Sequence, residues 1–172
     1  IKSGEALESA GSLTHVVFDK TGTLTEGRPE VTEIVVRDGS RMFNTEDELL
    51  TLAATLEELS EHPLAGAVLR AAEERGLNDR IPIERFQAVP GRGVTGILED
   101  GSEVFIGSAN YMRELGLSDK LLEAKADELS MGGHTLLYLA MNHELLGLIG
   151  ATDKLKPGSI EAVERLHKLG IQ

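Results

Sequence analysis

The chain has 172 residues, 41% of them hydrophobic and 27% charged, a composition typical of globular rather than disordered proteins. Its net charge of −12 argues against nucleic acid as a partner, because nucleic-acid-binding surfaces are basic. Cysteine is absent, which excludes disulfides, thiolate metal sites and cysteine nucleophiles, and the apolar runs are far shorter than a bilayer span.

The first predicted elements are β-strands. An apolar run at 13–18 predicts a short buried strand that ends at Asp19, and a polar loop follows at 20–27. Further strands are predicted at 31–36 and, after a turn, at 41–43.

Two helices are predicted next. Thr45 and Glu48 fit a capping box, in which each side chain satisfies an amide at the start of a helix. The apolar face of this helix is expected to comprise Leu49, Leu52, Ala53, Leu56 and Leu59. A second helix is expected to begin at Pro63, whose fixed φ suits a first turn, and to end before Gly76.

The second half of the chain alternates between strand and helix patterns. Strands are predicted within 83–88, 94–98, 104–106, 135–140 and 145–150, and helices at 109–115, at 119–131 and, opened by 153–157, up to 169.

These patterns predict a domain inserted into another domain. The ends of the chain are typical of an α/β domain, whereas the middle is typical of an antiparallel sheet with helices. We therefore expect an α/β fold with an α+β insert: one domain built from 1–26 and 151–172, and an inserted domain at 27–150. The linking strands are predicted at 25–29 and 151–156.

The strongest chemical signature follows the first predicted strand, in Asp19-Lys20-Thr21-Gly22-Thr23-Leu24-Thr25. Asp19 stands at the end of an apolar strand, where α/β folds place ligands, and an aspartate can attack phosphorus to form an aspartyl phosphate. Lys20 adds positive charge, and the loop that begins at Thr21 offers amides and hydroxyls for phosphate oxygens. Because Mg²⁺ prefers oxygen ligands, the Asp19 carboxylate and the Thr21 carbonyl are predicted to supply part of a magnesium shell.

This seven-residue stretch resembles the signature of P-type ATPases, the cation pumps that are phosphorylated on that aspartate. The resemblance implies that Asp19 is the phosphorylated nucleophile, with Lys20 and Thr21 as catalytic neighbours, in a phosphorylation domain of haloacid-dehalogenase-like fold. A solvated turn with a capping aspartate is the alternative without function. A haloacid-dehalogenase-type phosphatase is a further alternative, although such enzymes usually have a second aspartate where this chain has Thr21.

A second motif is Ser60-Glu61-His62-Pro63-Leu64. It resembles an element of the heavy-metal branch of P-type ATPases, whose histidine positions adenine in the nucleotide-binding domain. The resemblance implies that His62 and Glu57 bind ATP. The proline favours extended backbone at His62, beside a helix start, where a neutral imidazole can stack on a purine. In the alternative, His62 only caps the helix, and Glu58 rather than Glu57 faces the ligand.

A third motif is Pro90-Gly91-Arg92-Gly93-Val94-Thr95-Gly96. Its glycine spacing matches a dinucleotide fingerprint, but that fingerprint needs a helix directly after it, and 97–106 reads as a β-hairpin. The resemblance to heavy-metal pumps implies instead that Gly91 and Gly93 line the ATP pocket; a plain β-turn is the alternative. Many copper pumps have an asparagine after the glycine that corresponds to Gly107, so either Ser108 or Asn110 is expected to replace that contact.

The resemblance covers essentially the whole chain, with 27–150 as the nucleotide-binding domain and 1–26 and 151–172 as parts of the phosphorylation domain. Asp153 and Lys156 resemble the hinge between the two, although Asp153 could instead cap the last helix. The implied cofactors are ATP and Mg²⁺. The implied transported ion is Cu⁺, with Zn²⁺, Cd²⁺ or Co²⁺ as the alternative.

Other parts of such pumps are expected outside this chain. They are the remaining phosphorylation elements, the actuator domain and the transmembrane domain with its heavy-metal site, which would be its partners in one full-length protein. We therefore expect a cytosolic segment of an integral membrane protein that binds ATP, binds no nucleic acid and turns over little ATP alone. If it acts only as a nucleotide-binding module, replacing Asp19 leaves ATP affinity nearly unchanged, whereas replacing His62 reduces it.

Overall fold

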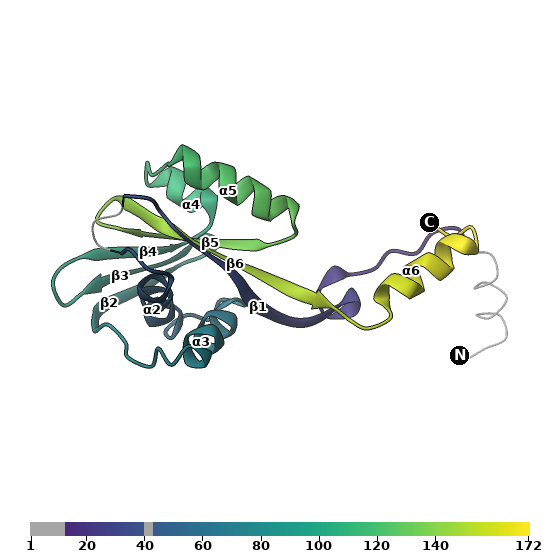
Figure 1. Cartoon of the computed structure of the whole chain (residues 1–172), viewed down its shortest axis with the longest axis horizontal. Helices are drawn as coiled ribbons and strands as arrows, with labels where there is room; N and C mark the ends of the chain where they lie inside the picture. The colour runs from purple at the N-terminus through teal and green to yellow at the C-terminus, as the bar shows by residue number, and fades with distance from the viewer. Residues whose placement is uncertain (1–12, 40–42) are drawn as a thin grey trace. The chain divides into compact units, whose positions relative to one another are not determined.

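The computed structural model describes residues 13–39 and 43–172 and divides the chain into two compact units (Figure 1). One unit, here called the end unit, combines the chain up to Arg28 with Asp153–Gln172. The other, here called the inserted unit, is Pro29–Thr152.

Six strands of the described chain form one sheet in the order β1-β6-β5-β4-β3-β2. Their bounds are β1 Thr25–Val36, β2 Ile83–Val89, β3 Gly93–Leu98, β4 Glu103–Gly107, β5 Thr135–Met141 and β6 Glu144–Leu155. From β2 to β6, each strand pairs antiparallel with the next one in the chain. The sheet confirms the strands that the sequence predicts at 31–36 and between 83 and 150. The predicted linking strands correspond to the start of β1 and the end of β6.

Helices cover both faces of the sheet in the inserted unit (Figure 1). Their bounds are α2 Glu46–Glu57, α3 Ala65–Glu74, α4 Ala109–Glu114 and α5 Lys120–Met131. On one face, α2 and α3 pack a core around Leu52, Leu56 and Val68 against Ile106 and Leu139 of the sheet. On the other face, α4 and α5 bury Met112 and Leu122 against Tyr138 and Leu148.

The predicted helix signals are mostly confirmed in the pair α2 and α3. The Thr45 side chain accepts the Glu48 N–H at 3.2 Å, and Glu48 Oε2 accepts the Thr45 N–H at 3.1 Å, which completes the capping box. Gly76 follows α3 with φ +73, and its N–H bonds the Glu73 carbonyl. The burial predicted for Leu59 is wrong: this residue lies beyond the end of α2 and is 53% exposed. Helix α3 also begins two residues after Pro63.

The end unit contains a tight turn at Lys20–Leu24, whose backbone is not helical at Thr21 and Gly22, and the helix α6 Ser159–Lys168. The predicted buried strand at 13–18 is wrong, because the segment is not in a ladder and Val17 is 96% exposed. Among the described residues, its backbone makes two hydrogen bonds, both to Gln172, through the Val16 N–H and the Thr14 carbonyl, and a strand needs a longer ladder. The strand predicted at 41–43 falls largely outside the described residues.

Candidate functional site

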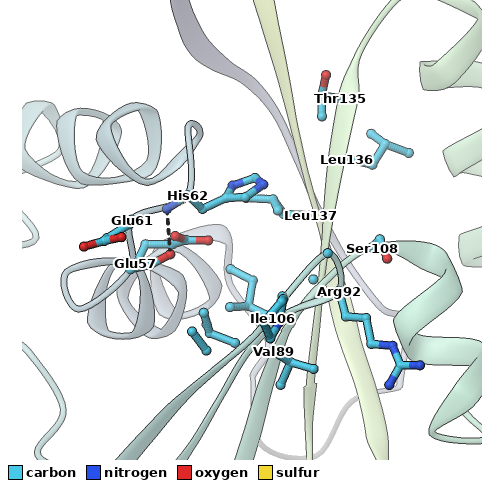
Figure 2. A pocket seen from close by; sticks show the side chains of 17 residues that line it. Glu57, Glu61, His62, Val89, Arg92, Ile106, Ser108, Thr135, Leu136 and Leu137 are labelled. Carbon is cyan, nitrogen blue, oxygen red and sulfur yellow. Dashed lines mark hydrogen bonds between the residues drawn. The ribbon is translucent and has the colours of Figure 1, made fainter.

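A cavity of about 360 Å³ opens in the inserted unit (Figure 2). Its walls come from the end of α2 and the turn after it, the β2–β3 turn, the end of β4 and the start of β5. The lining residues that the sequence had singled out are Glu57, His62, Gly91, Gly93 and Ser108. The fold therefore brings together, in one cavity, residues that are up to 51 positions apart in the sequence.

The turn between α2 and α3 holds His62 at this cavity. The His62 N–H donates to Ser60 Oγ at 3.1 Å, and the His62 carbonyl accepts the Ala65 N–H at 2.9 Å. The ring nitrogen Nδ1 accepts the Leu64 N–H at 3.3 Å, so the neutral ring carries its proton on Nε2. His62 therefore meets an amide at the start of α3, as in the capping alternative, and keeps Nε2 as a donor.

Glu57 supplies a buried carboxylate to the same cavity. Its residue is 2% exposed, and Oε2 has no hydrogen-bond partner in the described part of the chain. Burial raises the pKa of Glu57, while a hydrogen bond with Ser60 and the charge of His62 oppose that rise. By contrast, Glu58 is exposed and pairs with Arg80 Nε at 3.3 Å. Of the two neighbouring glutamates, Glu57 alone lines the cavity, and its unpartnered oxygen is suited to an N–H donor such as a purine amino group.

Glycine is favoured at positions 91 and 93, between β2 and the start of β3, for different physical reasons. Gly91 has φ +72, a conformation that favours glycine, and a Cβ there would meet nothing within 4 Å. At Gly93, a Cβ would lie 2.0 Å from the Ile106 carbonyl oxygen and 2.6 Å from Gly107 Cα. Gly93 is therefore required by the close approach of β3 and β4, in addition to lining the cavity.

The structure separates the two candidates for the asparagine contact. Ser108 lines the cavity, and its Oγ accepts the Tyr111 N–H at 3.2 Å as the N-cap of α4. Asn110 is exposed, does not line the cavity, and accepts from Arg113 at 2.5 Å.

The loop after Asp19 lies in the end unit, with Asp19, Lys20 and Thr21 all exposed. The buried Thr25 shapes it: its Oγ1 accepts the Gly22 N–H at 3.1 Å and lies 3.0 Å from the Lys20 carbonyl oxygen. Gly22, with φ +76, makes the turn possible. The loop thus exposes Asp19 to solvent beside a turn that the Thr25 side chain stabilises.

The returning segment holds this loop from the other side. The Asp153 carboxylate accepts from Thr25 Oγ1 at 2.6 Å and from the N–H groups of Gly27 and Arg28, each at 3.1 Å. Lys156 Nζ donates to the Gly22 carbonyl. The alternative in which Asp153 caps the last helix is wrong, because Gly158 occupies the N-cap of α6 and Asp153 lies within β6.

The oxygen atoms near Asp19 fit magnesium by type, since carboxylate and carbonyl oxygens are hard ligands. Asp19 and Thr21 would supply only part of a shell. Within 13–39 and 43–172, the structure contains no group of three or more His, Asp or Glu side chains that could hold a metal ion. The same residues include no helix that is both long and apolar enough to cross a membrane.

A family model described as haloacid dehalogenase-like hydrolase matches residues 13–172. The chain belongs to the haloacid dehalogenase-like hydrolase family. This membership agrees with the predicted fold class, in which α/β end segments carry a domain of antiparallel sheet and helices.

Within this haloacid dehalogenase-like family, the chain is similar along its whole length to one segment of heavy-metal P-type ATPases. It is 42% identical to the "Copper-exporting P-type ATPase B" of Archaeoglobus fulgidus, over 100% of this chain and 24% of that protein. It is also 42% identical to the "Copper-exporting P-type ATPase" of Legionella pneumophila, over 100% of this chain and 22% of that protein. The resemblance inferred from the motifs is therefore confirmed, and the chain spans about a quarter of the length of these relatives.

The fold has a solved counterpart as well. A zinc-transporting PIB-type ATPase, crystallised in its E2.Pi state, superposes with a TM-score of 0.74 at 36% identity, over 100% of this chain and 27% of that one. The matched structure includes both units of this haloacid dehalogenase-like chain.

Sequence reasoning did not assign three features of the cavity. Ser60 and Arg92 stand inside the quoted motifs, so their positions could have suggested a role. The start of β5, at 135–137, completes the wall through sheet pairing, and its local pattern predicts only a strand. Asp153 likewise meets Thr25 across 128 positions, a contact for which the sequence carries no local signal.

Proposed function

We propose that the chain is the ATP-binding and phosphorylation segment of a P-type ATPase that exports a heavy-metal cation. The observation that carries the nucleotide site is the buried Glu57 Oε2, which has no hydrogen-bond partner among residues 13–39 and 43–172, in the same cavity as the His62 ring. A carboxylate oxygen accepts the exocyclic amino group of adenine, and the imidazole offers a flat face and the Nε2 donor. The open surface at Gly91 leaves space for close approach of the ligand.

In this proposal Asp19 receives the γ-phosphoryl group of ATP. A carboxylate oxygen of Asp19 forms a bond to the γ-phosphorus as the bond from that phosphorus to the β–γ bridging oxygen breaks, which gives aspartyl phosphate and ADP. Lys20 supplies positive charge beside the reacting groups. Magnesium, when bound through the Asp19 carboxylate and the Thr21 carbonyl, would neutralise phosphate charge.

We assign Cu⁺ as the transported ion, and it would bind in a transmembrane domain of the full-length protein. The assignment is supported by the names of the two relatives at 42% identity, whereas the structural relative at 36% identity is a zinc transporter. Metal-stimulated ATP hydrolysis by the full-length protein tests it. Stimulation by Cu⁺ but not by Zn²⁺ is the expected result, and the reverse would reject copper.

Calorimetric titration of this chain with ATP tests the nucleotide site. We expect saturable binding to one site and, in His62→Ala, a loss of affinity of about tenfold, the size of one good hydrogen bond in a desolvated site. Asp19→Asn serves as the control, because the acceptor aspartate is not part of the cavity and its replacement should leave the affinity nearly unchanged. Binding that is indifferent to His62 would reject the assigned pocket.

A further inference from the structure

One charged side chain on the wall of the cavity has no part in the proposed adenine contacts. Arg92 lies in the β2–β3 turn, and in Figure 2 it is on the side of the cavity opposite Glu57 and His62. Among the described residues that line the cavity, Arg92 is the one lysine or arginine. The other fixed charges of the lining, on Glu57 and Glu61, are negative.

The backbone of Arg92 is fixed on both sides. Its N–H donates to the Val89 carbonyl at 3.0 Å, and its carbonyl accepts the Ser108 N–H at 2.9 Å. A Cβ on Gly107 would lie 2.4 Å from the Arg92 carbonyl oxygen, so β4 packs directly against this peptide. The guanidinium is therefore carried by a turn that cannot easily move away from the cavity.

The Arg92 side chain is oriented by one ion pair and keeps hydrogen-bond donors for a ligand. Its Nε pairs with Glu114 Oε2 at 2.9 Å, and both side chains are about half exposed. In the described part of the chain, the ion pair of Arg92 is made through Nε, and its two terminal nitrogens donate no hydrogen bond. A guanidinium held through Nε keeps its two terminal nitrogens as donors, and phosphate oxygens are acceptors that match this group.

The negative charge of the chain makes a positive side chain at the position of Arg92 favourable for binding a phosphate. The chain carries a net charge of −12, which disfavours the approach of a triphosphate. If the base lies beside Glu57 and His62, repulsion from the Glu57 and Glu61 carboxylates favours a phosphate chain that extends toward the opposite side of the cavity. Arg92 is the group on that side that can compensate its charge.

We propose that Arg92 binds the phosphate chain of the nucleotide, with Glu114 as the positioning residue that orients its guanidinium. This inference rests on the proposed function, because it takes the base to lie beside His62. It identifies the ligand by class, as a nucleoside polyphosphate rather than a nucleoside. The affinity contributed by Arg92 is then expected to grow with the number of phosphates.

The test is a titration of this chain with adenosine, AMP and ATP, followed by nuclear magnetic resonance so that weak binding is measured. Arg92→Ala should lower the affinity for ATP by about tenfold, as expected for a lost charge-assisted hydrogen bond. It should leave the affinity for adenosine within about twofold of the unmodified chain. Arg92→Lys should retain part of the ATP affinity, because it keeps the charge without the planar fork. Arg113→Ala is the matched control, since it removes the same charge from an exposed position of α4 outside the cavity.

The outcomes separate this inference from the proposed function. An equal loss for ATP and adenosine in Arg92→Ala, or an equal loss of ATP affinity in Arg113→Ala, would overturn the role of Arg92. If adenosine binding still depends on His62 in that case, the adenine site stands without it. If the unmodified chain binds neither adenosine nor ATP, both the proposed function and this inference are rejected.

Discussion

At the scale of single residues, the buried carboxylate of Glu57 has opposite effects on the stability of the fold and on ligand binding. Its Oε2 atom is buried without a hydrogen-bond partner in the described chain, and burial raises its pKa. An ionised carboxylate in such a place destabilises the folded state, because its hydration is lost without full replacement. The same unpartnered oxygen can accept a hydrogen bond from a ligand. Glu57 therefore lowers stability in the free protein and is expected to be stabilised by the bound base.

Replacing Glu57 by glutamine should raise the melting temperature at neutral pH by roughly 2 to 4 °C, since relief of an uncompensated buried charge amounts to about 1 kcal/mol. The sign of the pH dependence follows from the raised pKa. The folded wild-type chain loses stability as pH rises from the ordinary value of 4.5 through the raised pKa of Glu57. The gain in Glu57→Gln should therefore shrink as pH falls through that range. Thermal unfolding of Glu58→Gln, which alters an exposed neighbour, is the control.

The affinity for ATP should depend on pH through the same carboxyl group. An ionised Glu57 can accept a hydrogen bond from the amino group of adenine through its unpartnered Oε2, whereas the protonated form has lost one acceptor site. As pH falls through the raised pKa, wild-type affinity should decrease, while Glu57→Gln should bind more weakly at neutral pH and depend less on pH. Titrations in matched buffers measure this difference. A wild-type profile parallel to that of Glu57→Gln would exclude Glu57 as the titrating group.

The two turn glycines should differ when each is replaced by alanine. Gly93→Ala forces a methyl group to within 2.0 Å of the Ile106 carbonyl oxygen, so β3 and β4 must separate, at a cost of about 2–3 kcal/mol. Gly91→Ala meets no atom within 4 Å and bears only the strain of a left-handed backbone, about 1 kcal/mol. Urea unfolding of the two variants measures the order. Equal losses would mean that β4 can shift to admit a side chain.

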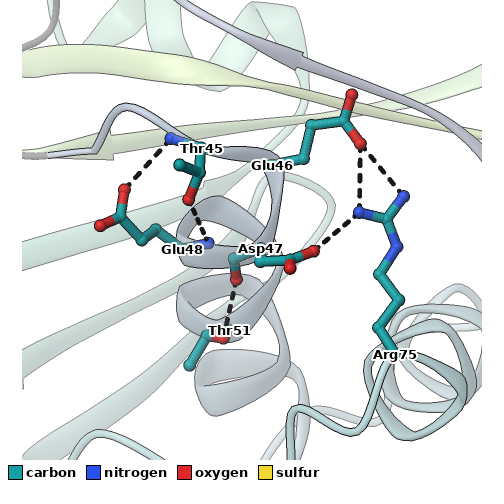
Figure 3. Close-up of polar contacts among 6 residues, drawn as sticks. All are labelled: Thr45, Glu46, Asp47, Glu48, Thr51 and Arg75. Atoms are coloured by element: carbon teal, nitrogen blue, oxygen red, sulfur yellow. Dashed lines mark hydrogen bonds and ion pairs between the residues drawn. The ribbon is translucent and has the colours of Figure 1, made fainter.

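At the scale of elements, α2 shows how a local signal fixes a helix that positions the site. The capping box between Thr45 and Glu48 satisfies amides at its first turn, and Figure 3 shows both of its bonds. Arg75, after the end of α3, pairs with Glu46 and Asp47 of that turn. The negative side chains lie at a helix start and the arginine at a helix end, which suits both helix dipoles. The opposite end of α2 carries Glu57, so its position depends on this anchoring.

Thr45, the N-cap of α2, and Thr51, within α2, offer a matched comparison of capping and helix propensity. Thr45→Ala should lower the free energy of unfolding by about 1 kcal/mol, because the Glu48 N–H loses its acceptor. Thr51→Ala removes a hydroxyl whose partner in the described structure is the Asp47 carbonyl of the same helix, so the change should be near zero or slightly stabilising. Urea unfolding followed by circular dichroism measures both. A larger loss at Thr51 would contradict the capping argument.

Element prediction succeeded where the pattern and its partners are close in sequence. Alternation at 94–98 and the turn after it suffice for the β3–β4 hairpin, because the paired strand follows within a few residues. The segment at 13–18 has an equally apolar pattern, but its only described backbone partner is Gln172. Composition predicts burial, whereas a strand also requires a neighbour, and the sequence pattern cannot supply one. The error at Leu59 has a local cause, since helical periodicity continues past the point at which α2 ends.

At the scale of the whole molecule, the candidate site residues divide between the two units. Local motifs predicted Asp19 in the end unit and Glu57, His62, Gly91 and Gly93 in the inserted unit. The side-chain contacts around them are long-range and were not predictable. Arg92 pairs with Glu114, which follows it in the chain after β3 and β4, and Asp153 bonds Thr25, which is 128 positions away. Motifs therefore supplied the candidate site residues, and the fold showed which residues contact one another around them.

Asp153 connects the two chain segments of the end unit, and its removal gives a direct test of that connection. Its carboxylate accepts the N–H groups of Gly27 and Arg28 and the Thr25 hydroxyl, and bonds to a charged acceptor are the stronger ones. Asp153→Ala should therefore speed hydrogen exchange at the Gly27 and Arg28 amides by about tenfold or more. Exchange at the Ile81 amide, which bonds Thr55 in the inserted unit, should not change. Glu26→Ala removes an equal charge from an exposed position of β1, and if it accelerates exchange at the same two amides, general electrostatics rather than the Asp153 contacts would explain their protection.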